Sequence, residues 1–170
     1  MIFFKKKLHF LELTRQDLKV LIPVCLTVIF IDLLTKKLVF DANVNGYYIC
    51  SILNILKVKN YGISFGLFHE NPDVAIYFIV ILDLLIIAYL LSCFKKTNQY
   101  LNPVLFASSV SLILGGAFGN LIDRLYYGFV RDFIDLHINV YHWPCFNIAD
   151  SCICVGAGIL VVCELFFRKK

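Results

Sequence analysis

Four long apolar stretches constrain the fold of this chain more than any other feature. A hydrocarbon core of about 30 Å is crossed by about 20 helical residues, and each stretch has roughly that length. A span inside lipid must satisfy its own backbone hydrogen bonds, which predicts helices. The expected spans are residues 20–40, 74–94, 103–125 and 148–167.

Composition supports a membrane-embedded chain. Of its 170 residues, 60% are hydrophobic and 16% are charged, whereas soluble domains carry about 25% charged residues. The net charge of +4 does not indicate a nucleic-acid partner, because the basic residues gather at the ends of apolar stretches, as membrane topology requires. We therefore expect an all-α membrane protein, in a single domain over residues 1–170, with membrane lipid around it.

The expected topology follows from the distribution of basic residues. Most of the sixteen Lys and Arg residues lie in the N-terminal segment, the Lys95-Lys96 turn and the C-terminal tail, which places both termini in the cytoplasm. No cleavage site follows the first apolar stretch, so we expect that helix to be retained. Residues 41–73 and 126–147 then face outward. Alternation in residues 48–59 predicts a small extracytoplasmic β element.

Charged residues within the first two spans indicate a functional site, because burying charge in lipid is costly. Asp32 precedes Lys36 by four residues, the favourable order for a helical pair. The pair could neutralise itself and reach the membrane interface, or form the polar wall of a site. Asp83, in the middle of the second span, is expected to pair with Lys36 or Arg124.

The third span combines glycines with polar residues in the segment Gly115–Arg124. The glycines let a neighbouring helix approach closely. Asn120, Asp123 and Arg124 follow Gly116 at intervals of four, seven and eight residues, which predicts one polar face turned to the interior.

Two acidic residues in the second outer region have contrasting surroundings. Asp132 lies among apolar residues, which raise the pKa of a carboxyl group. Asn147 and Asp150 resemble a capping box at the start of the fourth span, where the helix dipole favours an ionised carboxylate. Carboxyl groups in such contrasting environments are typical of acid–base catalysis.

Two other motifs carry less weight. Gly62–Gly66 matches the Gly-x-Ser-x-Gly pattern around Ser64, but that motif needs an α/β sheet. His137 and His142 lie five residues apart without an HExxH motif, and the seven cysteines lack zinc-finger spacing, so no metal or cofactor is expected. Tyr141, His142 and Trp143 are instead expected in an interfacial aromatic belt.

Five motifs occur in order along the chain. Asp32–Lys36 is similar to D-x-x-T-K, Asn60–Phe65 to N-x-G-x-x-F, Gly115–Arg124 to G-G-A-x-G-N-x-x-D-R, Asp132–Ile134 to D-F-I and Phe146–Asp150 to F-N-x-A-D. Together they resemble the lipoprotein signal peptidase (signal peptidase II) family of bacterial membrane aspartic peptidases. Ile63, Ser64 and Arg131 depart from the family pattern, beside the expected site.

This resemblance implies an activity and a division of roles. Asp132 and Asp150 would form a catalytic dyad that cuts lipid-modified prolipoproteins before the diacylglyceryl-modified cysteine. The remaining residues would line or support the pocket: Asn60, Asn120, Asn147 and Arg124, with Asp123 supporting Arg124, and Asp32 and Lys36 as a positioning pair. The enzyme would be a monomer in the bacterial cytoplasmic (inner) membrane, with its active site on the extracytoplasmic side.

Two other classes of protein remain open. An ion transporter could relay charge through Asp32, Asp83 and Asp123, but most motif residues gather towards the outer half of the spans. A structural scaffold would need the glycines of the third span but neither Asp132 nor Asp150.

Overall fold

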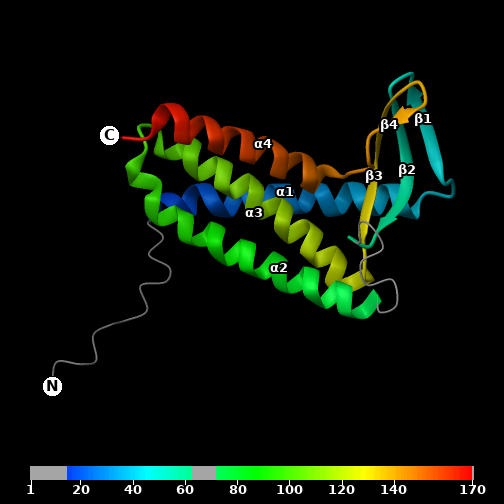
Figure 1. Ribbon diagram of the computed structural model, residues 1–170, viewed down its shortest axis with the longest axis horizontal. Helices are drawn as coiled ribbons and strands as arrows, with labels where there is room; N and C mark the ends of the chain where they lie inside the picture. Colours follow the sequence, from blue (N-terminus) through cyan, green and yellow to red (C-terminus); the bar gives the residue numbers. More distant parts are fainter. Residues whose placement is uncertain (1–14, 63–71, 170) are drawn as a thin grey trace.

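Four helices lie side by side, with a small sheet at one end of the bundle (Figure 1). This computed structural model describes residues 15–62 and 72–169; Ile63, Ser64 and Phe65, discussed above, lie outside them. The helices are α1 Arg15–Asp41, α2 Pro72–Cys93, α3 Pro103–Tyr127 and α4 Ile148–Val162, with η2 Phe94–Gln99 after α2 and η3 Cys163–Phe167 after α4. The predicted fold class is confirmed: within the described residues, four helices, at residues 17–41, 76–93, 103–127 and 148–167, are long and apolar enough to cross a membrane.

The sheet is antiparallel and has the order β1-β2-β3-β4. Its strands are β1 Gly46–Cys50, β2 Leu53–Asn60, β3 Val130–Ile138 and β4 Tyr141–His142. The β1–β2 hairpin confirms the element expected in the first outer region. Strand β3 was not anticipated from the pattern of residues, which left Asp132 in a loop. It forms because β2 supplies the backbone partners, with Val58 opposite Asp132.

Helix α3 is the centre of the bundle. In its most apolar stretch 72% of the residues are buried, against 17% in each of the other three helices. The outer helices instead expose large apolar side chains, as lipid-facing surfaces do. On α1 these recur every four residues, at Ile22, Leu26, Phe30, Leu34 and Leu38.

Local sequence signals fix both ends of α3. Asn102 accepts a hydrogen bond from the backbone N–H of Leu105, and Pro103 occupies the first turn, where its missing N–H costs nothing. Gly128 ends the helix with φ 76°, a left-handed conformation that glycine adopts without strain. The chain then enters β3 two residues later, which carries Asp132 to the end of the bundle.

Small residues bring the helices into close contact. A Cβ atom on Gly116 would collide with the backbone carbonyl oxygen of Ala149 in α4, and one on Gly119 would lie 2.6 Å from Oδ2 of Asp32 in α1. The sequence-based expectation of close packing at the α3 glycines is therefore confirmed, and it places both α1 and α4 directly against the backbone of α3.

We expect Gly116→Ala to destabilise the protein by about 1–3 kcal/mol, the usual cost of overpacking, because rigid backbone faces the added methyl group. Thermal unfolding of the purified protein in detergent measures this. Gly158→Ala in α4 is the matched control, because a Cβ there meets nothing within 4 Å. Equal unfolding temperatures for the two variants would contradict the close approach.

Candidate functional site

A buried lysine organises the polar interior at the sheet end of the bundle. The Nζ atom of Lys36 lies 2.7 Å from Oδ2 of Asp32 and 3.4 Å from Oδ2 of Asp123, and it donates a hydrogen bond of 2.9 Å to Oδ1 of Asn120. Lys36, Asp32 and Asp123 are all 0% exposed. Of the two interpretations of the Asp32–Lys36 pair, the structure supports the polar wall and contradicts a pair that reaches the interface.

Two asparagines join the two proposed catalytic acids. Nδ2 of Asn147 donates to Oδ1 of Asp132 at 2.7 Å and to Oδ1 of Asn120 at 3.1 Å. Nδ2 of Asn120 in turn donates to Oδ1 of Asp150 at 2.8 Å. The acids come from different elements, Asp132 from β3 and Asp150 from the first turn of α4. The structure thus brings them into one hydrogen-bonded cluster.

The start of α4 is held from two directions. The predicted capping box is confirmed: the side chain of Asn147 accepts from the N–H of Asp150 at 2.9 Å, and that of Asp150 accepts from the N–H of Asn147 at 3.2 Å. From α1, Oδ1 of Asp32 accepts the N–H of Ala149 at 2.9 Å. Three of the backbone donors at this helix end therefore point at carboxylate or amide oxygens, which orients the Asp150 side chain.

Asp132 is buried, and the pKa of its carboxyl group is raised. The pKa of Asp132 is raised to about 6, mainly by burial and also by the nearby carboxylate of Asp150, although hydrogen bonds from Asn60 and Asn147 oppose the rise. Nδ2 of Asn60 donates to Oδ2 of Asp132 at 2.8 Å. Asp132 therefore keeps its proton to a higher pH than an exposed aspartate, as its apolar sequence neighbours predicted.

The expected link between Asp123 and Arg124 is wrong. Arg124 donates to Asp83 in α2 at 2.8 Å, which resolves the choice of partner for Asp83. Asp123 turns the other way, towards Lys36 and Arg131. Consecutive helical residues point about 100° apart, so Asp123 and Arg124 lie on opposite sides of Asn120 on the polar face of α3: Asp123 is turned towards α1 and β3, and Arg124 towards α2.

Arg131, which the sequence placed beside the site, is part of the buried network. Its side chain is 7% exposed, and its Nη2 lies 2.7 Å from Oδ1 of Asp123. The backbone N–H of Arg131 also donates to Asp123, at 3.0 Å, and its guanidinium lies over the ring of Tyr127. This ion pair ties β3 to α3. In the sequence, the only feature that could have indicated this ion pair is a single arginine a few residues after the end of α3.

The acids in this cluster are surrounded by donors. Amide groups of Asn60, Asn120 and Asn147 point at Asp132 and Asp150, and the Lys36 ammonium lies among them. A site built for a cation would instead offer further oxygen or imidazole ligands. The arrangement therefore suits acid–base chemistry with water, in which one carboxyl group takes a proton and its neighbour gives one.

These features define a multi-pass membrane protein with paired acids clustered where its helices meet a small sheet. A family model described as signal peptidase (SPase) II matches residues 24–166. The lipoprotein signal peptidase of Haemophilus influenzae is 40% identical over 143 residues, which cover 82% of each chain. That of Francisella tularensis subsp. novicida is 36% identical over 162 residues, which cover 94% of this chain and 99% of the relative.

The fold agrees with this match. A solved structure of a bacterial membrane enzyme superposes with a TM-score of 0.71 at 31% identity, covering 85% of this chain and 86% of the other. The chain belongs to the signal peptidase II family and is a peptidase. This assignment decides against the transporter and scaffold alternatives.

Lys36→Met should destabilise the protein by about 3–5 kcal/mol, because it leaves buried carboxylates without their cation. Denaturant or thermal unfolding in detergent measures the loss. Lys37→Met is the matched control. Lys37 pairs with Asp41, four residues further along α1, but both side chains are more than half exposed. The unfolding of this variant should therefore stay close to that of the unaltered protein. Similar behaviour of the two variants would contradict a structural role for Lys36.

Proposed function

We propose that this chain removes signal peptides from lipid-modified prolipoproteins, with Asp132 and Asp150 as its catalytic dyad. The observation that carries the proposal is the cluster in which Asn147 contacts both acids while Asn120 binds the second. Because the two carboxyl groups sit on separate elements, their spacing depends on the fold rather than on one segment. The names of the relatives, lipoprotein signal peptidase, support the substrate class.

The mechanism uses a single proton shared by the dyad. Asp150 lies in the first turn of α4, where the helix dipole favours an ionised carboxylate, and it accepts hydrogen bonds from Asn120 and from a backbone N–H, so we assign it as the base. It takes a proton from water, which attacks the scissile carbonyl carbon. Asp132, with its raised pKa, donates its proton to the carbonyl oxygen. The carbonyl carbon of the substrate thereby becomes a tetrahedral intermediate with two hydroxyl groups.

Collapse of that intermediate breaks the peptide bond. The proton taken by Asp150 passes to the leaving amine, and one hydroxyl proton of the intermediate returns to the dyad as the new carboxyl group forms. The dyad thus ends with one proton, as it began. Asn60, Asn120, Asn147 and Arg124 would line the pocket, and Asp32, Lys36 and Asp123 would position it.

The surroundings of the dyad suit a substrate that stays partly in lipid. The outer helices expose apolar side chains along their lengths, so acyl chains can remain in the bilayer while the signal segment enters sideways. We further propose a monomer, over residues 1–170 as one peptidase domain, in the bacterial cytoplasmic (inner) membrane. Its termini would lie in the cytoplasm and the sheet with the dyad on the outer side, as the distribution of Lys and Arg predicts.

Asp132→Asn and Asp150→Asn should each lower the cleavage rate by about 10²–10⁴-fold, the usual range for a lost general acid or base. Purified variants and a synthetic diacylglyceryl-modified precursor peptide provide the assay, with thermal unfolding to verify the fold. Asp41→Asn is the matched control, since Asp41 is an exposed carboxylate at the end of α1. Normal cleavage by either dyad variant would refute the assignment.

The pH dependence of cleavage should follow the proton on Asp132. An acid with a raised pKa is protonated below that pKa, so kcat/KM should fall as pH rises through it. Asn60 stabilises the ionised form and lowers the pKa; Asn60→Ala should therefore move this fall to higher pH, whatever it does to the maximal rate. Asn54→Ala, which removes a donor to Asp135 instead, should leave the position of the fall unchanged. A shift to lower pH in Asn60→Ala would exclude Asp132 as the acid.

A further inference from the structure

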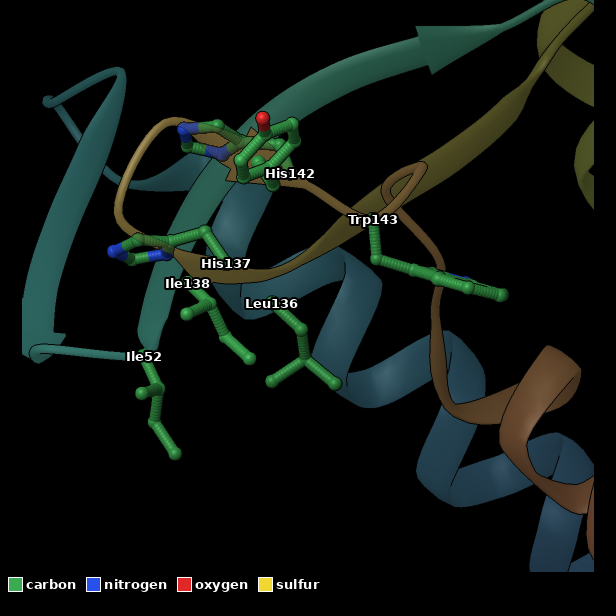
Figure 2. A pocket seen from close by; sticks show the side chains of 7 residues that line it. Ile52, Leu136, His137, Ile138, His142 and Trp143 are labelled. Atoms are coloured by element: carbon green, nitrogen blue, oxygen red, sulfur yellow. The ribbon is translucent and has the colours of Figure 1, made fainter.

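Three metal-ligating side chains meet where β3 and β4 turn back on each other. Asp135, His137 and His142 each offer one ligand atom, and these atoms lie within 4.8 Å of one another. Figure 2 shows the two imidazole rings one above the other at this turn, with Trp143 further along the chain. None of the three residues takes part in the hydrogen bonds that join the dyad.

The strands explain how these residues come together. Asp135 and His137 are two positions apart on β3, so their side chains leave the same face. His142 on β4 is the cross-strand partner of His137, which places its side chain on that face too. The turn between them contains Asn139 with φ 53°, a conformation that asparagine tolerates in tight hairpins. The sequence alone did not predict this pairing, because His137 and His142 are five residues apart in a segment that we expected to be a loop.

The distances from Asp135 to the two histidines lie on either side of the spacing between ligands of one ion. Nδ1 of His142 lies 2.7 Å from Oδ1 of Asp135, and Nδ1 of His137 lies 3.7 Å from Oδ2 of the same carboxylate. Ligands about 2.0–2.1 Å from a tetrahedral zinc ion are about 3.3 Å apart, between these two values. The rings stack with centroids 4.9 Å apart and planes 16° apart, so they must turn towards each other for both nitrogens to face one ion.

One of these ligand atoms has no other role in the structure. Nδ1 of His137 is buried and makes no hydrogen bond within the described part of the chain, although buried polar atoms are nearly always paired. Asp135 is 1% exposed, and its Oδ2 accepts a hydrogen bond of 3.0 Å from Asn54 in β2. Such a support orients a carboxylate ligand. The carboxylate of Asp135 is thus held in place, and Nδ1 of His137 beside it is left unpaired.

The cluster is also accessible from outside. The side chain of His142 is 51% exposed, and both histidines line an open pocket of about 450 Å³ beside Ile52, Leu136 and Trp143 (Figure 2). An ion can enter from this side, and water can occupy a fourth coordination position there. Two imidazoles and one carboxylate are a ligand set typical of zinc.

We propose that Asp135, His137 and His142 bind a divalent zinc ion that fastens β4 to β3. The ion would replace the hydrogen bond between His142 and Asp135, and Asn54 would keep its contact with the carboxylate. This site is independent of the proposed peptidase chemistry, because it uses neither of the dyad residues.

Zinc binding to the full-length, untagged protein in detergent tests the proposal. After treatment with a chelator, the protein should bind about one zinc ion, and Co²⁺ should give the visible absorption of a tetrahedral site. Asp135→Asn and His142→Asn should each weaken zinc affinity more than about 100-fold, beyond the loss caused by removing a supporting contact. Zinc should raise the unfolding temperature of the unaltered protein but not that of these variants.

Cys145→Ser is the matched control. Cys145 is a free thiol close enough to Asp135 for their charges to interact, and it should bind zinc as the unaltered protein does. Unfolding temperatures measured without metal show whether each variant folds; His142→Asn changes a half-exposed side chain and should be tolerated. No zinc binding by the unaltered protein, or binding that survives in both site variants and is lost in Cys145→Ser, would overturn the proposal.

Discussion

The structure depends on one ammonium group buried among helices. The three protons of Lys36 match its three neighbours, Asp32, Asp123 and Asn120. Taking this charge out of water is costly unless each proton has a partner. Asp32 in turn holds the start of α4, and Asp123 holds Arg131 at the start of β3. The same contacts that neutralise the lysine therefore set the positions of both segments that carry the proposed dyad.

Charge balance in this cluster explains why the proposed dyad would hold a proton. Lys36 and Arg131 contribute two positive charges, and Asp32 and Asp123 contribute two negative charges, so these four groups compensate one another. Asp132 and Asp150 have only amide and backbone donors as immediate partners. Two further ionised carboxylates would be uncompensated in a poorly hydrated site. The raised pKa of Asp132 is the consequence.

The sequence predicted features that depend on local or periodic patterns. The length of the apolar stretches predicted the four spans. Asn147 and Asp150 predicted the capping box, and the glycines of α3 predicted the close contacts between helices. Features that depend on contacts between distant segments of the chain were not predicted from the sequence. Strand β3 needs β2 beside it, and the partner of Asp123 lies beyond the turn at Gly128. Nothing in the α3 segment alone indicates that Asp123 pairs with Lys36 and Arg131 while the adjacent Arg124 pairs with Asp83.

Strand β3 connects these observations, because its position decides where Asp132 lies. At its start, Arg131 anchors it to α3 through Asp123. In the middle, Asn60 and Asn147 hold the carboxyl group of Asp132 from two sides. Beyond that point, Asn54 binds Asp135, and two stacked histidines close the hairpin. Val130 and Phe133 are the buried apolar side chains of this strand, so much of its position depends on polar contacts. Polar anchors at both ends therefore keep the acid within reach of Asp150.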